Sequence, residues 1–196
     1  EQIFDSKYFE VFEKVCSQKQ NSPNFVVSIL CSTVTNLERK GLDSSLLDDK
    51  QIMEIFGLLE QEKINKENLN FKIINSSISG ETTSGGLARI SKAIESIKPD
   101  YLLLELGGND ALRGYPPKQI AANLVKMIKI ADYADAKVFL MQIRIPPNYG
   151  SRYQKALESI YPSIASETSA TLIPFMLEEV ALNEDLMLPD GIHPKA

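Results

Sequence analysis

Two polar segments of this 196-residue chain carry side chains suited to stabilising charge in a reaction. The first is the end of Leu102–Arg113, where an apolar run stops at Gly107-Gly108 and Asn109-Asp110 follows. Paired glycines at a strand's carboxyl end let the backbone turn sharply and let another molecule approach closely. In open α/β sheets, ligands bind at that end of the strands. Asn109 is a neutral hydrogen-bond donor there, and therefore suits a developing oxyanion.

The second segment is Asp190-Gly-Ile-His193-Pro194, which holds the only histidine of the chain. A histidine three residues after an aspartate, on a loop stiffened by Gly and Pro, fits a general base with its orienting carboxylate. His193 would take the proton of a serine and pass it to the leaving group, while Asp190 would fix the tautomer of the ring. The alternative is that His193 is a surface residue in a Pro-bounded turn.

Together with Asn75–Arg89, these two segments resemble the SGNH branch of the GDSL hydrolases, in particular the bacterial multifunctional esterase, thioesterase and lysophospholipase I enzymes. The resemblance runs from about Phe71 to Ala196 and includes Met141–Gly150 and Ile173–Glu179. A Gly-Gly-Asn-Asp sequence alone is weak evidence. Three blocks in the family's order, with the terminal Asp-x-x-His, form a specific pattern.

The resemblance implies a serine hydrolase that cleaves esters or thioesters of acyl chains, lysophospholipids included, without a cofactor. It assigns the oxyanion donors to the backbone N–H of Gly80 and the side chain of Asn109. Each residue also has a simpler interpretation: Gly80 as a turn glycine and Asn109 as a cap of the turn after its strand. We expect Asp110 to cap the following turn.

Four further residues are expected to border the substrate. Leu112 and Tyr115 follow the oxyanion asparagine and resemble the loop that closes over acyl chains in this family. Ile145 and Pro146 follow the next predicted strand at the same edge of the sheet. Ordinary loop packing is the alternative for all of these side chains.

The nucleophile is the residue that the sequence identifies least directly, because the family's Gly-Asp-Ser-Leu motif is absent. Ser32 directly follows the first predicted strand, but Leu30 and Cys31 stand where the family has Gly and Asp. Ser44 follows Asp43 and lies 36 positions before the glycine at 80, a spacing that suits the family better. We assign the nucleophile to Ser32 on topology and keep Ser44 as the alternative.

Strands that alternate with helices predict an α/β fold, in which a parallel sheet is covered on both faces. We expect a three-layer α/β/α sandwich with a five-stranded parallel, flavodoxin-like sheet. The predicted strands are Phe25–Cys31, Phe71–Ile74, Tyr101–Leu106, Ala136–Ile143 and Thr171–Pro174, and the predicted helices are Phe4–Val15, Leu46–Lys63, Ser84–Ile97, Pro117–Ala134 and Arg152–Ala165. Residues 1–22 are expected to form a helical extension. Residues 23–196 are expected to form the hydrolase-like domain without the final helix of its relatives.

Composition excludes several classes of partner. A net charge of −5 argues against nucleic acid, and the absence of an 18-residue apolar run argues against stable insertion into a membrane. One histidine among scattered carboxylates forms no metal-ligand cluster, so we expect no metal. Two cysteines make no disulfide framework and leave the compartment open. The family resemblance implies a periplasmic or secreted protein, and the oligomeric state stays open.

Two other functions fit parts of the sequence. Because the nucleophile motif is missing, the chain could be a member of the same fold that binds acyl ligands without turnover. It could also be a flavodoxin-like binder of a nucleotide or phosphate, with Gly85-Gly86 at a helix start holding the anion. No Gly-x-Gly-x-x-Gly or P-loop pattern accompanies these glycines.

Overall fold

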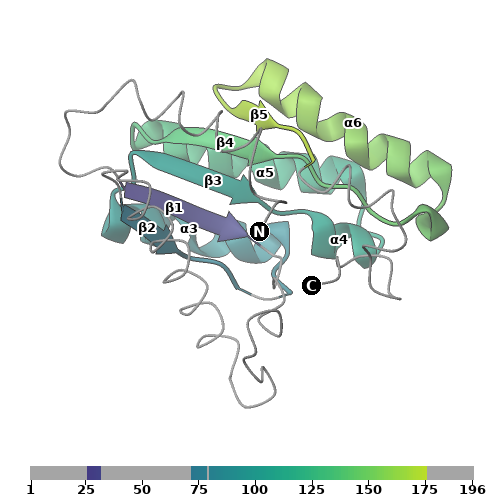
Figure 1. Ribbon diagram of the computed structural model, residues 1–196, viewed down its shortest axis with the longest axis horizontal. Coiled ribbons are helices and arrows are strands. Elements are labelled where there is room, and N and C mark those ends of the chain that lie inside the picture. The colour runs from purple at the N-terminus through teal and green to yellow at the C-terminus, as the bar shows by residue number, and fades with distance from the viewer. Residues whose placement is uncertain (1–25, 32–71, 79, 176–196) are drawn as a thin grey trace, which may run out of the picture.

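The computed structural model describes residues 26–31, 72–78 and 80–175 (Figure 1), and its strands form one sheet. The strands are β1 (Val26–Cys31), β2 (Lys72–Asn75), β3 (Tyr101–Glu105), β4 (Lys137–Met141) and β5 (Thr171–Ile173). Their order across the sheet is β2-β1-β3-β4-β5, and each neighbouring pair is parallel. The predicted α/β class is therefore confirmed.

Strands β3 and β4 are apolar and mostly buried, as is usual for the inner strands of parallel sheets. Leu102 and Leu104 of β3 are buried in the main hydrophobic core. The alternate position Tyr101 is also buried, and its ring stacks on that of Phe139 with centroids 5.9 Å apart. Because successive side chains of a strand point to opposite faces, both faces of the sheet carry buried side chains.

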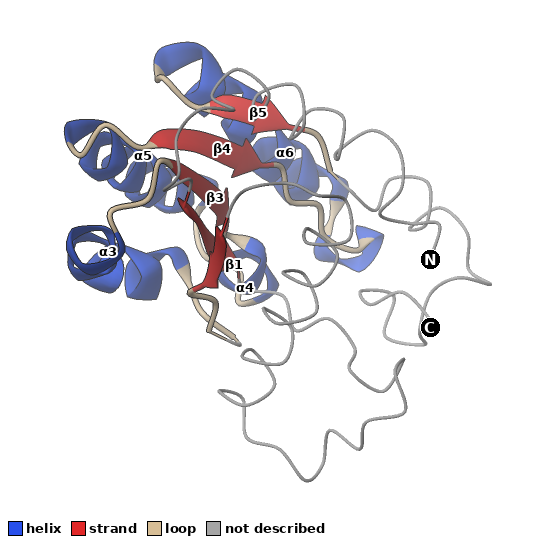
Figure 2. Ribbon diagram, turned by 60° about the vertical axis from the view of Figure 1, so that its left-hand side comes forward, coloured by secondary structure: helices blue, strands red, loops and turns tan. Residues whose placement is uncertain are grey.

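Three helices, α3 (Thr83–Ile97), α5 (Pro117–Tyr133) and α6 (Ser151–Glu167), pack side by side on one face of the sheet (Figure 2). Each leads to the next strand in the same direction across the sheet, and right-handed crossovers then place all three on the same side. Their apolar stripes and alternate strand positions form the core, which includes Ile90, Leu102, Leu124, Met127, Ile128, Val138, Leu140, Leu157 and Tyr161. The predicted helices Phe4–Val15 and Leu46–Lys63 lie outside the described residues.

A short helix, α4 (Gly108–Leu112), follows β3 at the carboxyl end of the sheet, where the sequence predicted only a turn. Gly107 precedes it with a φ of 116°, a backbone conformation that favours glycine. A Cβ atom at this position would overlap the hydroxyl oxygen of Tyr161 and lie 3.1 Å from Cγ2 of Ile120. The Tyr161 hydroxyl donates to the carbonyl oxygen of Leu106 at 3.0 Å. The start of α4 is thus set by close packing between β3 and α6.

Replacing Gly107 by alanine should destabilise the protein by roughly 2–5 kcal/mol, because backbone strain and overpacking add at one position. Gly114→Ala is the matched control, since Gly114 also has a positive φ (72°) but has no atom within 4 Å of the added Cβ. It should cost only about 1 kcal/mol. Urea unfolding of both variants measures the difference. Equal losses would show that the contact with Tyr161 does not restrict this position.

Candidate functional site

The loops that carry the predicted oxyanion donors lie at the carboxyl edge of the sheet. Gly80 follows β2, and Asn109 lies in α4 after β3. Strand β1 runs between β2 and β3, and its last residue, Cys31, pairs with Glu105 at the end of β3. The topology therefore places the two loops on either side of the end of β1. Ser32 follows that strand in sequence.

Gly80 occupies a tight turn. The N–H of Glu81 donates to the carbonyl oxygen of Ile78 at 3.2 Å, and Gly80 has a φ of 70°. Nη2 of Arg113, which follows α4, donates to the carbonyl oxygen of Gly80 at 3.2 Å. Gly80 is thus a turn glycine, as its simpler interpretation holds, and its turn is bonded directly to the segment that follows Asn109.

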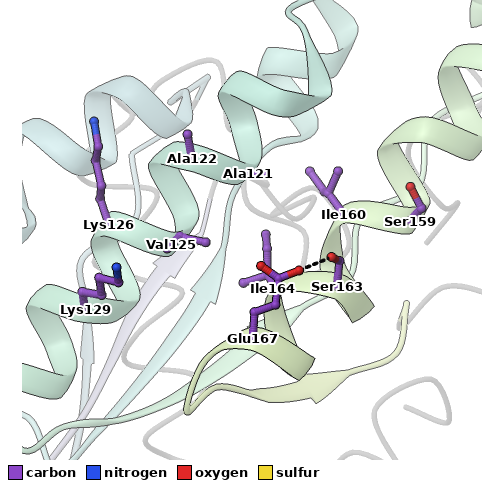
Figure 3. Close-up of a pocket in the computed structure, with 10 residues that line it drawn as sticks. All are labelled: Ala121, Ala122, Val125, Lys126, Lys129, Ser159, Ile160, Ser163, Ile164 and Glu167. Carbon is purple, nitrogen blue, oxygen red and sulfur yellow. Dashed lines mark hydrogen bonds between the residues drawn. The ribbon is translucent and has the colours of Figure 1, made fainter.

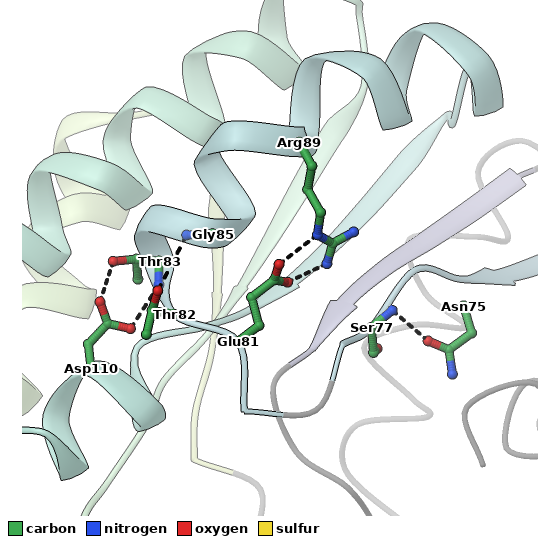
Figure 4. A network of polar contacts seen from close by, with 8 residues as sticks. All are labelled: Asn75, Ser77, Glu81, Thr82, Thr83, Gly85, Arg89 and Asp110. Atoms are coloured by element: carbon green, nitrogen blue, oxygen red, sulfur yellow. Dashed lines mark hydrogen bonds and ion pairs between the residues drawn. The ribbon is translucent and has the colours of Figure 1, made fainter. Parts of the chain in front are cut away.

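Asp110, which follows Asn109, is fully buried and bonds to the first residue of α3 (Figure 4). Its Oδ2 atom accepts from the backbone N–H of Thr83 at 2.8 Å, and its Oδ1 atom accepts from the Thr83 hydroxyl at 2.6 Å. We expected this carboxylate to cap the turn that follows it. It instead caps a different helix, because the first N–H groups of α3 have no partner within that helix and favour an anionic acceptor.

The same contacts argue against a phosphate site at Gly85-Gly86. Besides Thr83, the N–H of Gly85 donates to Oγ1 of Thr82 at 3.3 Å, and the N–H of Gly86 donates to the Thr82 carbonyl at 3.0 Å. The N-terminus of α3 is therefore already occupied by protein acceptors. Gly86 serves packing instead, since an added Cβ would lie only 2.5 Å from Cδ1 of Leu106.

Glu81, between Gly80 and the start of α3, is held by an ion pair. Nε of Arg89 donates to its Oε1 at 2.7 Å, and Nη2 of the same guanidinium bonds to Oε2 (Figure 4). Two parallel bonds between arginine and a carboxylate fix orientation as well as distance. The turn that contains Gly80 is therefore anchored to the second turn of α3.

The four residues expected to border the substrate differ in exposure. Ile145 is 7% exposed and belongs to the hydrophobic core, and Leu112 is half-buried against that core. Tyr115 is 37% exposed, and its carbonyl accepts from the hydroxyl of Tyr153. Pro146 is half-buried. Packing accounts for Ile145, whereas Tyr115 has a surface that a ligand can reach; contact with a substrate stays a prediction for all four residues.

The expected triad, Ser32, Asp190 and His193, lies outside the described residues, as does the alternative nucleophile Ser44. Among residues 26–31, 72–78 and 80–175, no group of three or more His, Cys, Asp or Glu side chains could hold a metal ion. Within the same ranges, no helix is long and apolar enough to cross a bilayer.

An open groove of about 590 Å³ lies between α5 and α6 on the helical face of the domain (Figure 3). Ala121, Val125 and Ile160 give it an apolar lining, with Lys126 on the α5 side and Glu167 on the α6 side. Of the predicted site residues that the structure describes, Gly80, Asn109, Leu112, Tyr115, Ile145 and Pro146, none lines it. The groove is therefore separate from the candidate site at the strand ends.

A model of the GDSL-like lipase/acylhydrolase family matches residues 60–196 of the chain. The chain belongs to the GDSL-like lipase/acylhydrolase family. It is 50% identical to an arylesterase of Vibrio mimicus over 123 residues, which are 63% of this chain and 62% of the relative. It is 46% identical to thioesterase 1/protease 1/lysophospholipase L1 of Escherichia coli K12 over 122 residues, which are 62% of this chain and 59% of that protein. The chain thus spans about three fifths of the length of these relatives.

A solved esterase structure shares the fold. The crystal structure of the psychrotrophic esterase EstA from Pseudoalteromonas sp., inhibited by monoethylphosphonate, superposes with a TM-score of 0.70 at 36% identity. The superposition covers 87% of this chain and 87% of that one. The α/β architecture of the described residues is therefore that of a GDSL-like acylhydrolase.

Tyr161 should make the stability of the protein depend on pH. Burial, with smaller effects of Asp110 and Glu105, raises the pKa of this phenol well above its ordinary value of 10.0. A raised pKa in the folded state means that its stabilising contribution is complete below pH 10.0 and is lost as the pH rises towards the folded-state pKa. The unfolding free energy should therefore fall with a slope of up to about 1.4 kcal/mol per pH unit from this group.

Tyr161→Phe should remove that part of the slope, although it also lowers stability at neutral pH by about 1 kcal/mol through loss of the bond to Leu106. Urea unfolding of both proteins between about pH 9 and about pH 11 measures the two slopes. Parallel profiles would contradict a neutral, buried Tyr161.

Proposed function

We propose that this chain hydrolyses carboxylic esters or thioesters of acyl chains through an acyl-serine intermediate. The observation that carries the proposal is that hydrogen bonds join the segment around Gly80 to the segment around Asn109. Arg113 bonds to the turn of Gly80, and Asp110 bonds to Thr83 three residues further on. Membership of the GDSL-like lipase/acylhydrolase family supports the same chemistry.

In this mechanism Ser32 attacks the acyl carbonyl carbon while His193 accepts the hydroxyl proton. The tetrahedral oxyanion accepts hydrogen bonds from the Gly80 N–H and the Asn109 side chain. Collapse breaks the bond to the alcohol or thiol, which leaves with the proton held by His193, and the acyl group stays on serine. Water, deprotonated by His193, then attacks the carbonyl carbon of the acyl-serine ester; the bond to the serine oxygen breaks, His193 returns its proton to that oxygen, and the carboxylic acid is released. Asp190 orients the imidazole throughout.

The names of the relatives and the exposed Tyr115 at the strand ends support the proposed substrate class. The relatives' names, an arylesterase and a thioesterase/lysophospholipase, support small ester and thioester substrates, lysophospholipids among them. We assign the substrate walls to Leu112, Tyr115 and Pro146, with Ile145 supporting them from the core. The reaction as written needs no metal and no cofactor.

We also propose that residues 23–196 form the three-layer, five-stranded sandwich of the SGNH hydrolases. The shared fold of EstA supports this architecture. Residues 1–22 would form a helical extension, and the family resemblance favours action in the periplasm or outside the cell.

Replacing Asn109 by alanine should lower kcat for a short p-nitrophenyl ester by roughly 10² to 10³, the usual loss for one oxyanion donor. KM should change little, because the bond strengthens only in the transition state. Steady-state kinetics of the parent and the variant test this. A rise in KM with an unchanged kcat would instead make Asn109 a binding or capping residue.

A fluorophosphonate probe should label Ser32, because that residue follows β1, which runs between the strands leading to Gly80 and Asn109. Mass-spectrometric mapping of the adduct identifies the labelled serine, with Ser32→Ala and Ser44→Ala as a matched pair. An adduct kept in Ser32→Ala and lost in Ser44→Ala would move the nucleophile to Ser44. No adduct on any serine of the folded protein would favour a member of the family that binds acyl ligands without turnover.

A further inference from the structure

Asp110 has no place in the mechanism above, yet it is a fully buried carboxylate next to the proposed oxyanion donor Asn109. Both of its oxygen atoms are bonded to Thr83, a residue 27 positions earlier in the chain. A buried charged group is costly unless its hydrogen bonds are satisfied, so this contact constrains the structure around it strongly.

The contact joins the two segments that carry the oxyanion donors. Asn109 precedes Asp110 by one residue in α4, and Gly80 precedes Thr83 by three residues. One bond, at 2.8 Å, uses the backbone N–H of Thr83, and the other, at 2.6 Å, uses its hydroxyl. Two bonds between one carboxylate and one residue fix both the distance and the angle between α4 and the start of α3.

A third helix fixes the direction of the Thr83 hydroxyl. Nδ2 of Asn123, in α5, donates to Oγ1 of Thr83 at 3.0 Å and to Oγ of Ser84 at 3.2 Å. Because the Thr83 oxygen accepts from Asn123, its own proton is directed at Asp110. Thr83 and Asn123 are both buried, so water does not compete readily for these bonds.

We propose that Asp110 is a positioning residue, which holds Asn109 at the place where the oxyanion forms through its paired bonds to Thr83. This inference rests on the proposed function. Its consequence is that loss of the Asp110–Thr83 bonds should act on the reaction through Asn109. An oxyanion donor acts in the transition state, so a small displacement of it lowers kcat and leaves KM nearly unchanged.

The test compares Asp110→Asn, Thr83→Val and Thr83→Ser in hydrolysis of a short p-nitrophenyl ester. The amide of Asp110→Asn cannot accept from Thr83 with both of its terminal atoms. Thr83→Val removes the hydroxyl bond to Asp110, together with the oxygen that accepts from Asn123, and keeps the backbone bond. Both should lower kcat by roughly 10-fold to 10²-fold, since misplacement by about 1 Å has effects of this size. Thr83→Ser keeps both bonds and should stay within about threefold of the parent rate.

A double-mutant cycle separates positioning from a general effect on folding. In an Asn109→Ala background, Asp110→Asn should cause less than about a threefold further loss of kcat, because the donor that it positions is already gone. Ile94→Ala, at the other end of α3, is the control for stability. It should lower the melting temperature while kcat stays within about twofold of the parent value.

Each outcome bears on the proposal. A full additional loss from Asp110→Asn in the Asn109→Ala background would overturn the positioning role and leave the hydrolase function standing. The same holds if Thr83→Val and Thr83→Ser behave alike, or if Asp110→Asn fails to fold while Thr83→Val folds and keeps the parent kcat. A parent protein without ester hydrolysis would overturn the proposed function and this inference together.

Discussion

The bonds between the buried carboxylate of Asp110 and Thr83, where α3, α4 and α5 meet, are the interaction on which the carboxyl edge of the sheet depends. Asp110 is fully buried, and a charge in that position requires donors that water would otherwise supply. Thr83 supplies two, and the dipole of α3 favours a negative charge at its N-terminus. Helix α4 cannot move away from α3 without leaving this group unpaired. The spatial relation of the loops after β2 and β3 follows from that constraint.

Close packing acts beside this electrostatic constraint. Gly107 leaves no space for a side chain against Tyr161, and Gly86 leaves almost none against Leu106. Both glycines lie near the end of β3, where α3 and α6 approach the same strand. The helices are therefore near enough for Asp110 to reach Thr83, and the hydroxyl of Tyr161 can hold the carbonyl of Leu106. Packing and hydrogen bonding thus fix the same short segment independently.

The sequence predicted the features that arise from local pattern. Apolar runs and helical periodicity predict the segments 101–105, 117–133 and 151–167 to within two residues of their observed ends. The partner of Asp110 was not predictable in this way, because Thr83 lies 27 positions away and only the packing of α4 on α3 joins them. The sequence also allows Gly85-Gly86 to be interpreted as an anion site, because it does not show that Leu106 packs against Gly86. Glycines that permit close packing and glycines that bind anions have the same local sequence.

The short helix α4 was missed because five residues give too little periodicity to distinguish a helix from a turn. One sequence signal did bear on the partner of Asp110: Thr82 and Thr83 lie at the start of a predicted helix, and threonine is common at helix starts. An aspartate directly after the Gly-Gly-Asn sequence could have been matched to that start. The predicted Ser32, Asp190 and His193 rest on sequence alone and stay predictions.

A crystal structure of the protein after reaction with an alkyl phosphonate tests the central claim most directly, because the phosphonyl oxygen takes the place of the tetrahedral oxyanion. The account predicts that this oxygen lies about 2.7–3.1 Å from both the Gly80 nitrogen and the Asn109 side-chain nitrogen. It also predicts that the Asp110–Thr83 bonds are intact in the adduct. An adduct whose oxygen contacts neither donor would contradict the assignment of the oxyanion site, and with it the proposed mechanism.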